Sequence, residues 1–142
     1  MAAPRSTQSP PRASPGLGVS DHPYQGPPPA AALTADAAAR QRGRVEILNM
    51  TRPGGMDGWT MDADQYALVC STLFEALDAL ADSDGTAALK DVTAFVQSRL
   101  AGHPLFPQGR LTNYVRYTKV DLEPRCQLQR VANVSPQRIK TH

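Results

Sequence analysis

The sequence has few of the residues that build metal sites, disulfide frameworks or membrane spans. Its two cysteines, Cys70 and Cys126, lie far apart without a CxxC neighbour, and its three histidines do not cluster with them. A structural zinc site needs about four closely spaced ligands, so no metal site is predicted. No apolar run approaches the roughly 20 residues of a membrane helix, and the N-terminus lacks the apolar core of a secretory signal. We therefore expect a cytoplasmic protein that does not bind a membrane, with Cys70 packed in its core.

The residue patterns of common catalytic sites are also missing. No Ser-His-Asp or Cys-His set has a recognisable spacing, and no carboxylate pair stands apart from solvated helix faces. The run Pro53-Gly54-Gly55 is too short to cradle a phosphate and is better explained as a turn. The sequence therefore predicts no catalytic residue and no cofactor, and an enzyme is the least favoured class of function.

Apolar side chains are scarce in the first 43 residues, whereas proline is abundant there. This stretch holds eight of the chain's thirteen prolines. Its bulky apolar residues, besides the initiator methionine, are Leu17, Val19, Tyr24 and Leu33. So little apolar area cannot offset the entropy of ordering the backbone, so residues 1–43 are predicted to be a disordered tail. Within it, the alanine-rich residues 30–42 are expected to form at most a fraying helix. The folded domain is predicted to span residues 44–142, a normal size for one domain.

Charge is distributed unevenly along the chain, whose formal net charge is +2. Residues 44–107 carry four basic and nine acidic side chains, whereas residues 108–142 carry seven basic and two acidic ones. A basic C-terminal third attracts phosphates or acidic partners. The same charges can equally form an ordinary solvated face that the acidic half of the domain partly neutralises.

Three segments show the apolar periodicity of amphipathic helices. They are residues 62–80, 86–100 and 111–123, in which apolar side chains recur every three or four positions. Asp62 and Thr86 are predicted as the N-caps of the first two helices. In the third helix the buried stripe is predicted to consist of Leu111, Val115, Thr118 and Leu122.

Short strands are predicted before and after these helices. Residues 45–48 form a strand candidate that can pair with residues 59–61 across a Pro-Gly turn. After the third helix, residues 128–132 and 134–140 predict a two-stranded basic hairpin, in which Pro136 favours an edge strand. This order of elements is the one that a winged helix-turn-helix module requires. The predicted fold class is therefore α+β and winged helix-like, with three helices, a short N-terminal strand or hairpin, and a C-terminal two-stranded wing, all preceded by the disordered tail.

The outer face of the third helix and the wing carry the candidate binding residues. Asn113, Arg116 and Val120 are expected to point away from the buried stripe, with Tyr117 and Lys119 on the flanks. An amide and a guanidinium on such a face can reach base edges or phosphates. The predicted nucleic-acid-binding residues are Arg110, Asn113, Arg116, Lys119, Arg130, Arg138 and Lys140.

Five short motifs occur in these elements. They are residues 52–54 (Arg-Pro-Gly), 62–66 (Asp-Ala-Asp-Gln-Tyr), 119–123 (Lys-Val-Asp-Leu-Glu), 128–131 (Leu-Gln-Arg-Val) and 136–139 (Pro-Gln-Arg-Ile). Their order resembles a family of small bacterial proteins of unknown function with a winged helix-turn-helix-like domain, over about residues 45–141. The chain departs from the run typical of winged-helix regulators at Pro124 and at Cys126, where glycine is usual. The resemblance implies a fold but no catalytic signature.

Two classes of function are therefore favoured. One is a winged-helix module that binds double-stranded DNA through the residues named above. The other is a protein-interaction module, because many winged-helix domains bind proteins and a fold does not fix a function. In that case Val120, Tyr114 and Tyr117 would contact the partner. The sequence leaves the oligomeric state open, and a dimer is compatible with it.

Overall fold

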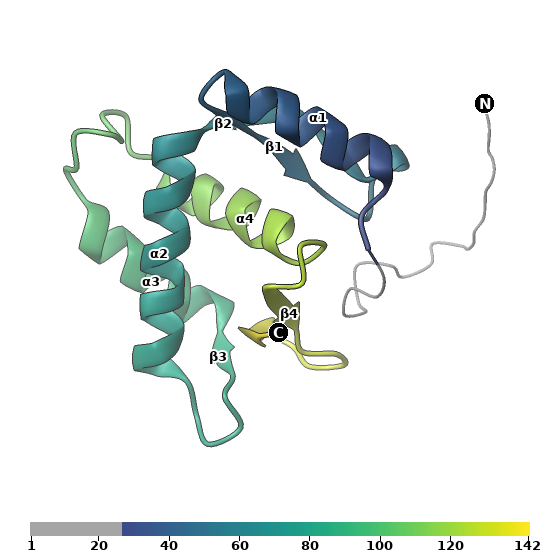
Figure 1. Ribbon diagram of the computed structural model, residues 1–142. Helices are drawn as coiled ribbons and strands as arrows, with labels where there is room; N and C mark the ends of the chain where they lie inside the picture. Colours follow the sequence, from purple (N-terminus) through teal and green to yellow (C-terminus); the bar gives the residue numbers. More distant parts are fainter. Residues whose placement is uncertain (1–26) are drawn as a thin grey trace.

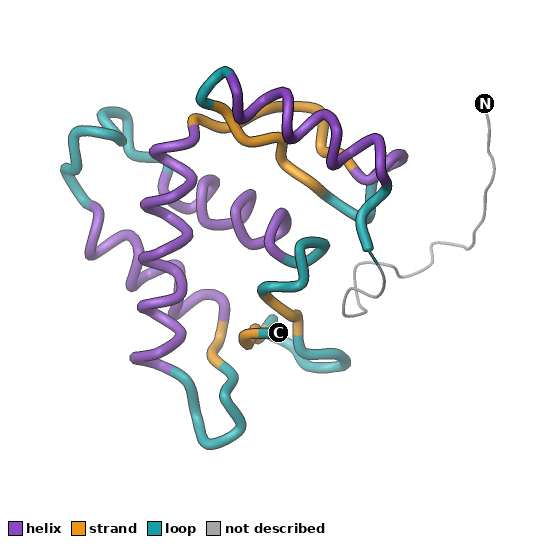
Figure 2. The backbone as a smooth tube through the Cα atoms, in the orientation of Figure 1, coloured by secondary structure: helices purple, strands orange, loops and turns teal. Residues whose placement is uncertain are grey.

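Residues 27–142 are described in a computed structural model of α+β architecture, with four α-helices and two small antiparallel sheets (Figures 1 and 2). The elements are α1 (Ala30–Gln41), β1 (Arg44–Leu48), a 3-10 turn η2 (Pro53–Gly55), β2 (Met56–Asp62), α2 (Ala63–Leu80), β3 (Ala87–Ala88), α3 (Leu89–Leu100), α4 (Leu111–Leu122), β4 (Leu128–Arg130) and β5 (Arg138–Thr141). Within this range every helix is too short or too polar to serve as a membrane span. The first 26 residues of the predicted tail lie outside the described residues.

α1 shows that the predicted tail extends too far along the chain. Residues 30–41, which composition placed outside the fold, form a helix that packs on the β1–β2 hairpin (Figure 1). Its buried residues are Ala32, Asp36 and Ala39. Because alanine is small, the helix can approach the hairpin closely without a bulky apolar stripe. Counting large apolar residues therefore predicted at most a fraying helix here and missed its packing on the fold.

The predicted N-terminal hairpin is present, and its second strand begins earlier than expected. β1 and β2 pair antiparallel, with Val45 opposite Met61. Gly55 closes the turn with a positive φ of 75°. A Cβ on Gly55 would lie 2.9 Å from Pro29 Cδ, so glycine also allows the start of α1 to pack against this turn. The hairpin is thereby fixed between α1 and the remaining helices.

α2, α3 and α4 enclose most of the hydrophobic core. Asp62 caps α2 as predicted, since its carboxylate accepts hydrogen bonds from the backbone N–H groups of Asp64 and Gln65 at 2.9 and 3.0 Å. The buried apolar side chains of these helices are Tyr66, Val69, Leu73, Ala76 and Leu77 of α2, Val92, Val96 and Leu100 of α3, and Leu111, Val115 and Leu122 of α4. The helix periodicity of the sequence therefore identified the core-facing sides.

The segment before α3 differs from the prediction. Thr86 does not cap the helix; its hydroxyl donates instead to Asp82 at 3.0 Å. Ala87 and Ala88 form the short strand β3, and α3 begins after Ala88 without a side-chain cap. This happens because β5 offers a partner strand for residues 87–88, which a local capping pattern cannot indicate.

The C-terminal strands join β3 in one three-stranded sheet with the order β3-β5-β4. Ile139 of β5 lies opposite Ala87 on one side and Arg130 on the other. β5 is therefore the central strand. The edge strand predicted from Pro136 is wrong, because β5 begins only at Arg138, after that proline.

Candidate functional site

α4 carries most of the predicted binding residues, and its neighbours leave one face of it open. The helix packs against α2, α3 and β1. Asn113 and Arg116 are exposed on the opposite side, and Val120 is half-buried beside them. Residues three and four positions apart share a helix face, so these side chains lie next to one another. α4 thus presents an amide and a guanidinium to solvent.

Arg110 adds a second exposed cation at the start of α4. It has left-handed backbone angles (φ 60°, ψ 26°) and directly precedes the first helical residue. Its carbonyl accepts hydrogen bonds from the N–H groups of Asn113 and Tyr114 at 3.1 and 3.2 Å. Of the predicted binding residues, Arg110, Asn113 and Arg116 are therefore gathered on the N-terminal half of α4.

A chain of ring contacts links this face to the β1–β2 hairpin. The Arg116 guanidinium lies over the Tyr117 ring, 5.0 Å from its centroid. The Tyr117 ring meets the Trp59 ring edge-on, with centroids 4.7 Å apart. The indole N–H of Trp59 donates to Asp57 Oδ2 at 3.0 Å. One flank of the open face is therefore formed by β2, a contribution that helix periodicity alone could not show.

Lys119 was predicted on a flank of this face, but the structure places it in the interior. Only 5% of the residue is exposed. Its Nζ forms an ion pair with Glu123 Oε2 at 3.0 Å. Burial lowers the pKa of Lys119 below its ordinary value, although the Glu123 carboxylate opposes this shift. The positive charge is thus committed within the fold rather than offered to a ligand.

The three basic residues predicted on the wing do not form one exposed patch. Arg138 donates to Thr86 Oγ1 at 3.0 Å and to Asp82 Oδ2 at 3.2 Å, which ties β5 to the loop after α2. Arg130 is half-buried and lies opposite the buried Ile139. Lys140 alternates to the other face of the sheet and is half-buried as well. Neither Arg130 nor Arg138 therefore resembles the open cations of α4.

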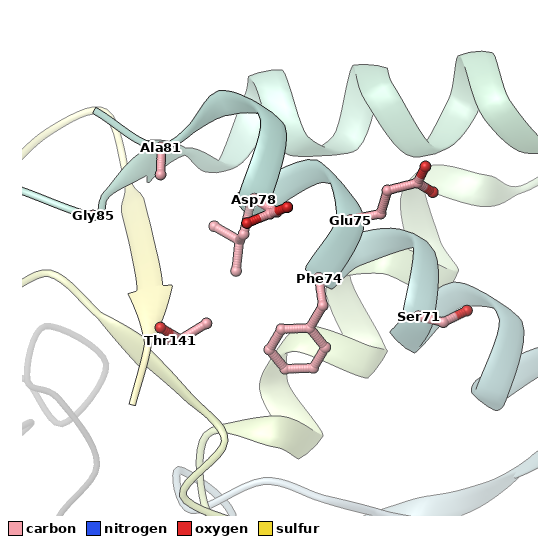
Figure 3. Close-up of a pocket in the computed structure, with 8 residues that line it drawn as sticks. Ser71, Phe74, Glu75, Asp78, Ala81, Gly85 and Thr141 are labelled. Carbon is pink, nitrogen blue, oxygen red and sulfur yellow. The ribbon is translucent and has the colours of Figure 1, made fainter. Parts of the chain in front are cut away.

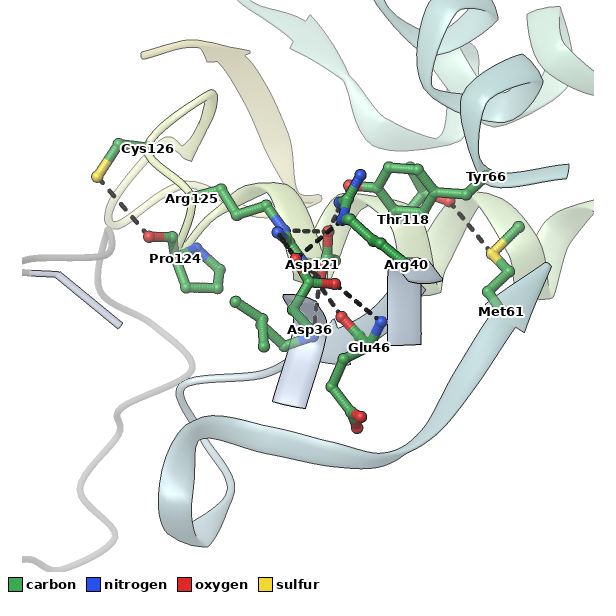
Figure 4. Close-up of polar contacts among 11 residues, drawn as sticks. Asp36, Arg40, Glu46, Met61, Tyr66, Thr118, Asp121, Pro124, Arg125 and Cys126 are labelled. Carbon is green, nitrogen blue, oxygen red and sulfur yellow. Dashed lines mark hydrogen bonds and ion pairs between the residues drawn. The ribbon is translucent and has the colours of Figure 1, made fainter. Parts of the chain in front are cut away.

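A buried polar cluster was missed from the sequence (Figure 4). Arg125, just after α4, donates to Asp121 through Nε at 2.7 Å and through Nη2 at 3.0 Å. Its Nη1 reaches Asp36 Oδ2 at 2.8 Å, and Nη2 also donates to the carbonyl of Glu46 at 2.9 Å. One guanidinium therefore joins α1, β1 and α4. The only sequence signal was the spacing of Asp121 and Arg125, four positions apart.

The two carboxylates of this cluster are fully used. Asp121 also accepts from the N–H of Leu48 at 2.8 Å and from the hydroxyl of Tyr66. Burial, with the Asp121 charge, raises the pKa of Tyr66 far above its ordinary value. Asp36 accepts in addition from the N–H of Glu46 at 3.0 Å. Largely buried and satisfied in its hydrogen bonds, the cluster stabilises the fold.

A groove lies between α2 and the end of β5 (Figure 3). Its volume is about 550 Å³, within the range of small-ligand pockets. The Phe74 ring points from α2 into this space, opposite Thr141. Glu75 on its rim is paired with Arg99, whereas Asp78 has no hydrogen-bond or ion-pair partner in the described part of the chain. The groove combines an apolar floor with one free carboxylate.

Metal ligands and reactive thiols do not gather around either region. In residues 27–142 no group of three or more His, Cys, Asp or Glu side chains could hold a metal ion. Cys126 is exposed, and Cys70, which was predicted in the core, is half-buried. The two candidate regions are thus the open face of α4 and the groove between α2 and β5.

Comparison with known proteins gives a family but no characterised relative. Neither the curated proteins nor the solved structures contain a match to the chain. A family model matches residues 44–139, which begin with β1 and end in β5. The matched region thus includes α4 and most of the buried cluster, but not α1. The chain belongs to this family of unknown function, DUF6958.

Proposed function

We propose that the protein is a winged helix-like module that binds double-stranded DNA through the outer face of α4. The proposal is carried by one observation: Arg110, Asn113 and Arg116 are all exposed along α4 and at its start. The element order α2–β3–α3–α4–β4–β5, with the sheet order β3-β5-β4, agrees with a winged helix in which α4 is the reading helix.

The chemistry of this face suits the major groove of B-DNA. That groove admits an α-helix, and its base pairs present distinct patterns of donors and acceptors. The Asn113 amide can pair with the edge of adenine, and the Arg116 guanidinium with guanine or a phosphate. Arg110, at the helix start, is placed to contact the backbone.

The number of open cations sets the expected strength of binding. Arg110 and Arg116 are exposed and Lys140 is half-exposed, whereas Lys119 is paired with Glu123 and Arg138 with Asp82. If each of the three open cations contacts one phosphate, the slope of log affinity against log salt is about −3. Binding to random duplex should therefore be weak, on the order of micromolar at low salt.

Fluorescence anisotropy of a labelled random duplex tests the proposal. The full 142-residue chain is titrated at low and at moderate salt, because α1 packs on the domain and should not be removed. We expect weak binding that decreases with salt, and Arg116→Ala should reduce the salt slope by about one. Arg99→Ala, a matched control on α3, should leave the slope unchanged. Absence of binding at low salt would reject the DNA proposal, and equal losses from both variants would reject α4 as the reading helix.

The groove between α2 and β5 favours protein interaction as the second candidate function. Tyr114 packs against Phe106 with ring centroids 5.3 Å apart, so it is less available to a partner than its sequence position suggested. The groove instead offers the Phe74 ring beside the free Asp78 carboxylate, an arrangement suited to a basic amphipathic segment. A photocrosslinking residue in place of Ser71 should then form one discrete adduct with the partner protein. Phe74→Ala and Asp78→Lys should each abolish this adduct. A crosslink that survives both changes would exclude this groove.

A further inference from the structure

We propose that Trp59 and Tyr117 are positioning residues that orient Arg116 to read guanine in duplex DNA. This inference rests on the proposed function and names the base that the α4 face would select. Trp59 lies on β2, whereas Arg116 and Tyr117 lie on α4. The two rings are 58 positions apart in the sequence, and folding of the hairpin against the helix brings them together.

The contacts form an ordered chain that ends at the guanidinium. Asp57 accepts the indole N–H of Trp59 at 3.0 Å, which fixes the indole on β2. Trp59 meets the Tyr117 ring at an interplanar angle of 70°, a favourable edge-on geometry. The Tyr117 ring then supports the Arg116 guanidinium, and Arg116 Nη2 donates to the Tyr117 hydroxyl at 3.3 Å. Each side chain in this series of contacts is therefore held by the one before it.

This support changes what Arg116 can do on binding. A free arginine side chain samples many rotamers, and ordering it weakens binding. The cation–π contact with the Tyr117 ring restricts the guanidinium beforehand. The central carbon of the guanidinium lies over the ring, and the hydrogen bond to the Tyr117 hydroxyl uses only Nη2. Within residues 27–142 the other N–H groups of the guanidinium have no partner, so they can donate to a ligand in the plane of the fork.

Guanine has the acceptors that match this fork. Its O6 and N7 atoms lie side by side in the major groove and accept two parallel hydrogen bonds from arginine. Adenine presents a donor next to its N7, so it cannot accept both bonds. An Arg116 fork that is held in place before binding should therefore discriminate between the two bases more strongly than a mobile one.

Two duplex probes of one guanine-rich sequence test this inference by fluorescence anisotropy with the full chain. In the second probe each guanine is replaced by 7-deazaguanine, which keeps Watson–Crick pairing but removes the N7 acceptor. We expect the unmodified protein to bind the second probe about tenfold more weakly. Tyr117→Leu, which removes the ring below Arg116, should abolish this discrimination, and Tyr117→Phe should restore it. Far-UV circular dichroism and the melting temperature show that each variant folds.

A second arginine–ring pair supplies the matched control. Arg99 lies over the Phe95 ring at 4.7 Å on α3, away from the open face of α4. Phe95→Leu should therefore leave the discrimination intact. DNA binding without discrimination, or discrimination that survives Tyr117→Leu, would overturn the inference while leaving the proposed function standing. Absence of binding to both probes would overturn the two together.

Discussion

Arg125 binds Asp36 across 89 positions of sequence, with Nη1 2.8 Å from Oδ2. The same guanidinium holds Asp121, so α1 and the end of α4 share one buried cation. α1 precedes the matched family region, which begins at residue 44. The ion pair therefore makes α1 a part of the fold. Removing the pair should lower the free energy of unfolding.

Asp36→Asn should destabilise the protein by about 1–3 kcal/mol, because the Arg125 and Arg40 guanidinium groups lose a charged acceptor. Asp78→Asn is the matched control, since that carboxylate is exposed and has no partner among the described residues. Its effect should stay within about 0.5 kcal/mol. Urea unfolding followed by circular dichroism measures both free energies. Similar values for the two variants would contradict a stabilising role for Asp36.

The contribution of Asp36 should also depend on pH. Burial alone would raise its pKa, but the hydrogen bond and charge of Arg125, and then those of Arg40, lower the pKa below the ordinary value of 3.8. A carboxylate with a depressed folded pKa contributes stability that is complete above the unfolded pKa and is lost as the pH falls through the folded pKa. The difference in unfolding free energy between the unmodified protein and Asp36→Asn should therefore be full at pH 7 and shrink below about pH 4. A difference of equal size at pH 7 and pH 3 would refute this account.

Removing α1 should lower the melting temperature. Comparison of residues 27–142 with residues 44–142 isolates the helix, since both chains contain every element of the matched region. The shorter chain loses the buried Ala32 and Ala39 and leaves Arg125 without Asp36. If the free energy of unfolding decreases by about 2 kcal/mol, the melting temperature should fall by roughly 8–16 °C. An unchanged midpoint in thermal circular dichroism would show that α1 adds nothing to the domain.

Local signals in the sequence predicted the elements whose structure depends on neighbours in the chain. The Asp62 cap and the stripe of α4 are examples, because a cap and a helix face are set within a few residues. The hairpin of β1 and β2 was also accessible, since its turn contains glycines with positive φ. In each case the spacing of residue types was enough.

Contacts between distant residues could not be predicted in this way. Arg138 pairs with Asp82 over 56 positions, and no local pattern indicates that pairing. Counting charges could not tell which basic residues of the C-terminal third are paired, whereas in the structure Lys119 and Arg138 form ion pairs with Glu123 and Asp82. The candidate site was therefore predicted where exposure follows from helix periodicity, as at Asn113 and Arg116, and not where packing decides it.

The two cysteines should differ in reactivity. Cys126 is exposed, whereas Cys70 is half-buried on α2, and burial raises the pKa of its thiol, with the Asp121 charge adding to the shift. Since the thiolate is the reactive form, Cys70 should react slowly with Ellman's reagent at pH 8. We expect one fast equivalent in the native protein and two in urea. Cys126→Ser should remove the fast phase, and a fast phase that persists would contradict the assignment.

Acylation of lysines tests the position of Lys119 without reference to any ligand. The chain has three lysines, and Lys90 on α3 is exposed while Lys119 is 5% exposed and paired with Glu123. The lowered pKa of Lys119 favours the neutral, nucleophilic amine, which by itself would speed acylation. Access opposes this effect, because Lys119 is buried and a reagent must open the packing around it to reach Nζ. We therefore expect brief treatment with acetic anhydride, followed by peptide mass spectrometry, to modify Lys90 long before Lys119. Urea should equalise the two rates, since unfolding exposes both amines. Comparable rates in the native protein would mean that Lys119 swings out to solvent, and it would then rejoin Arg110 and Arg116 as a cation available to phosphate.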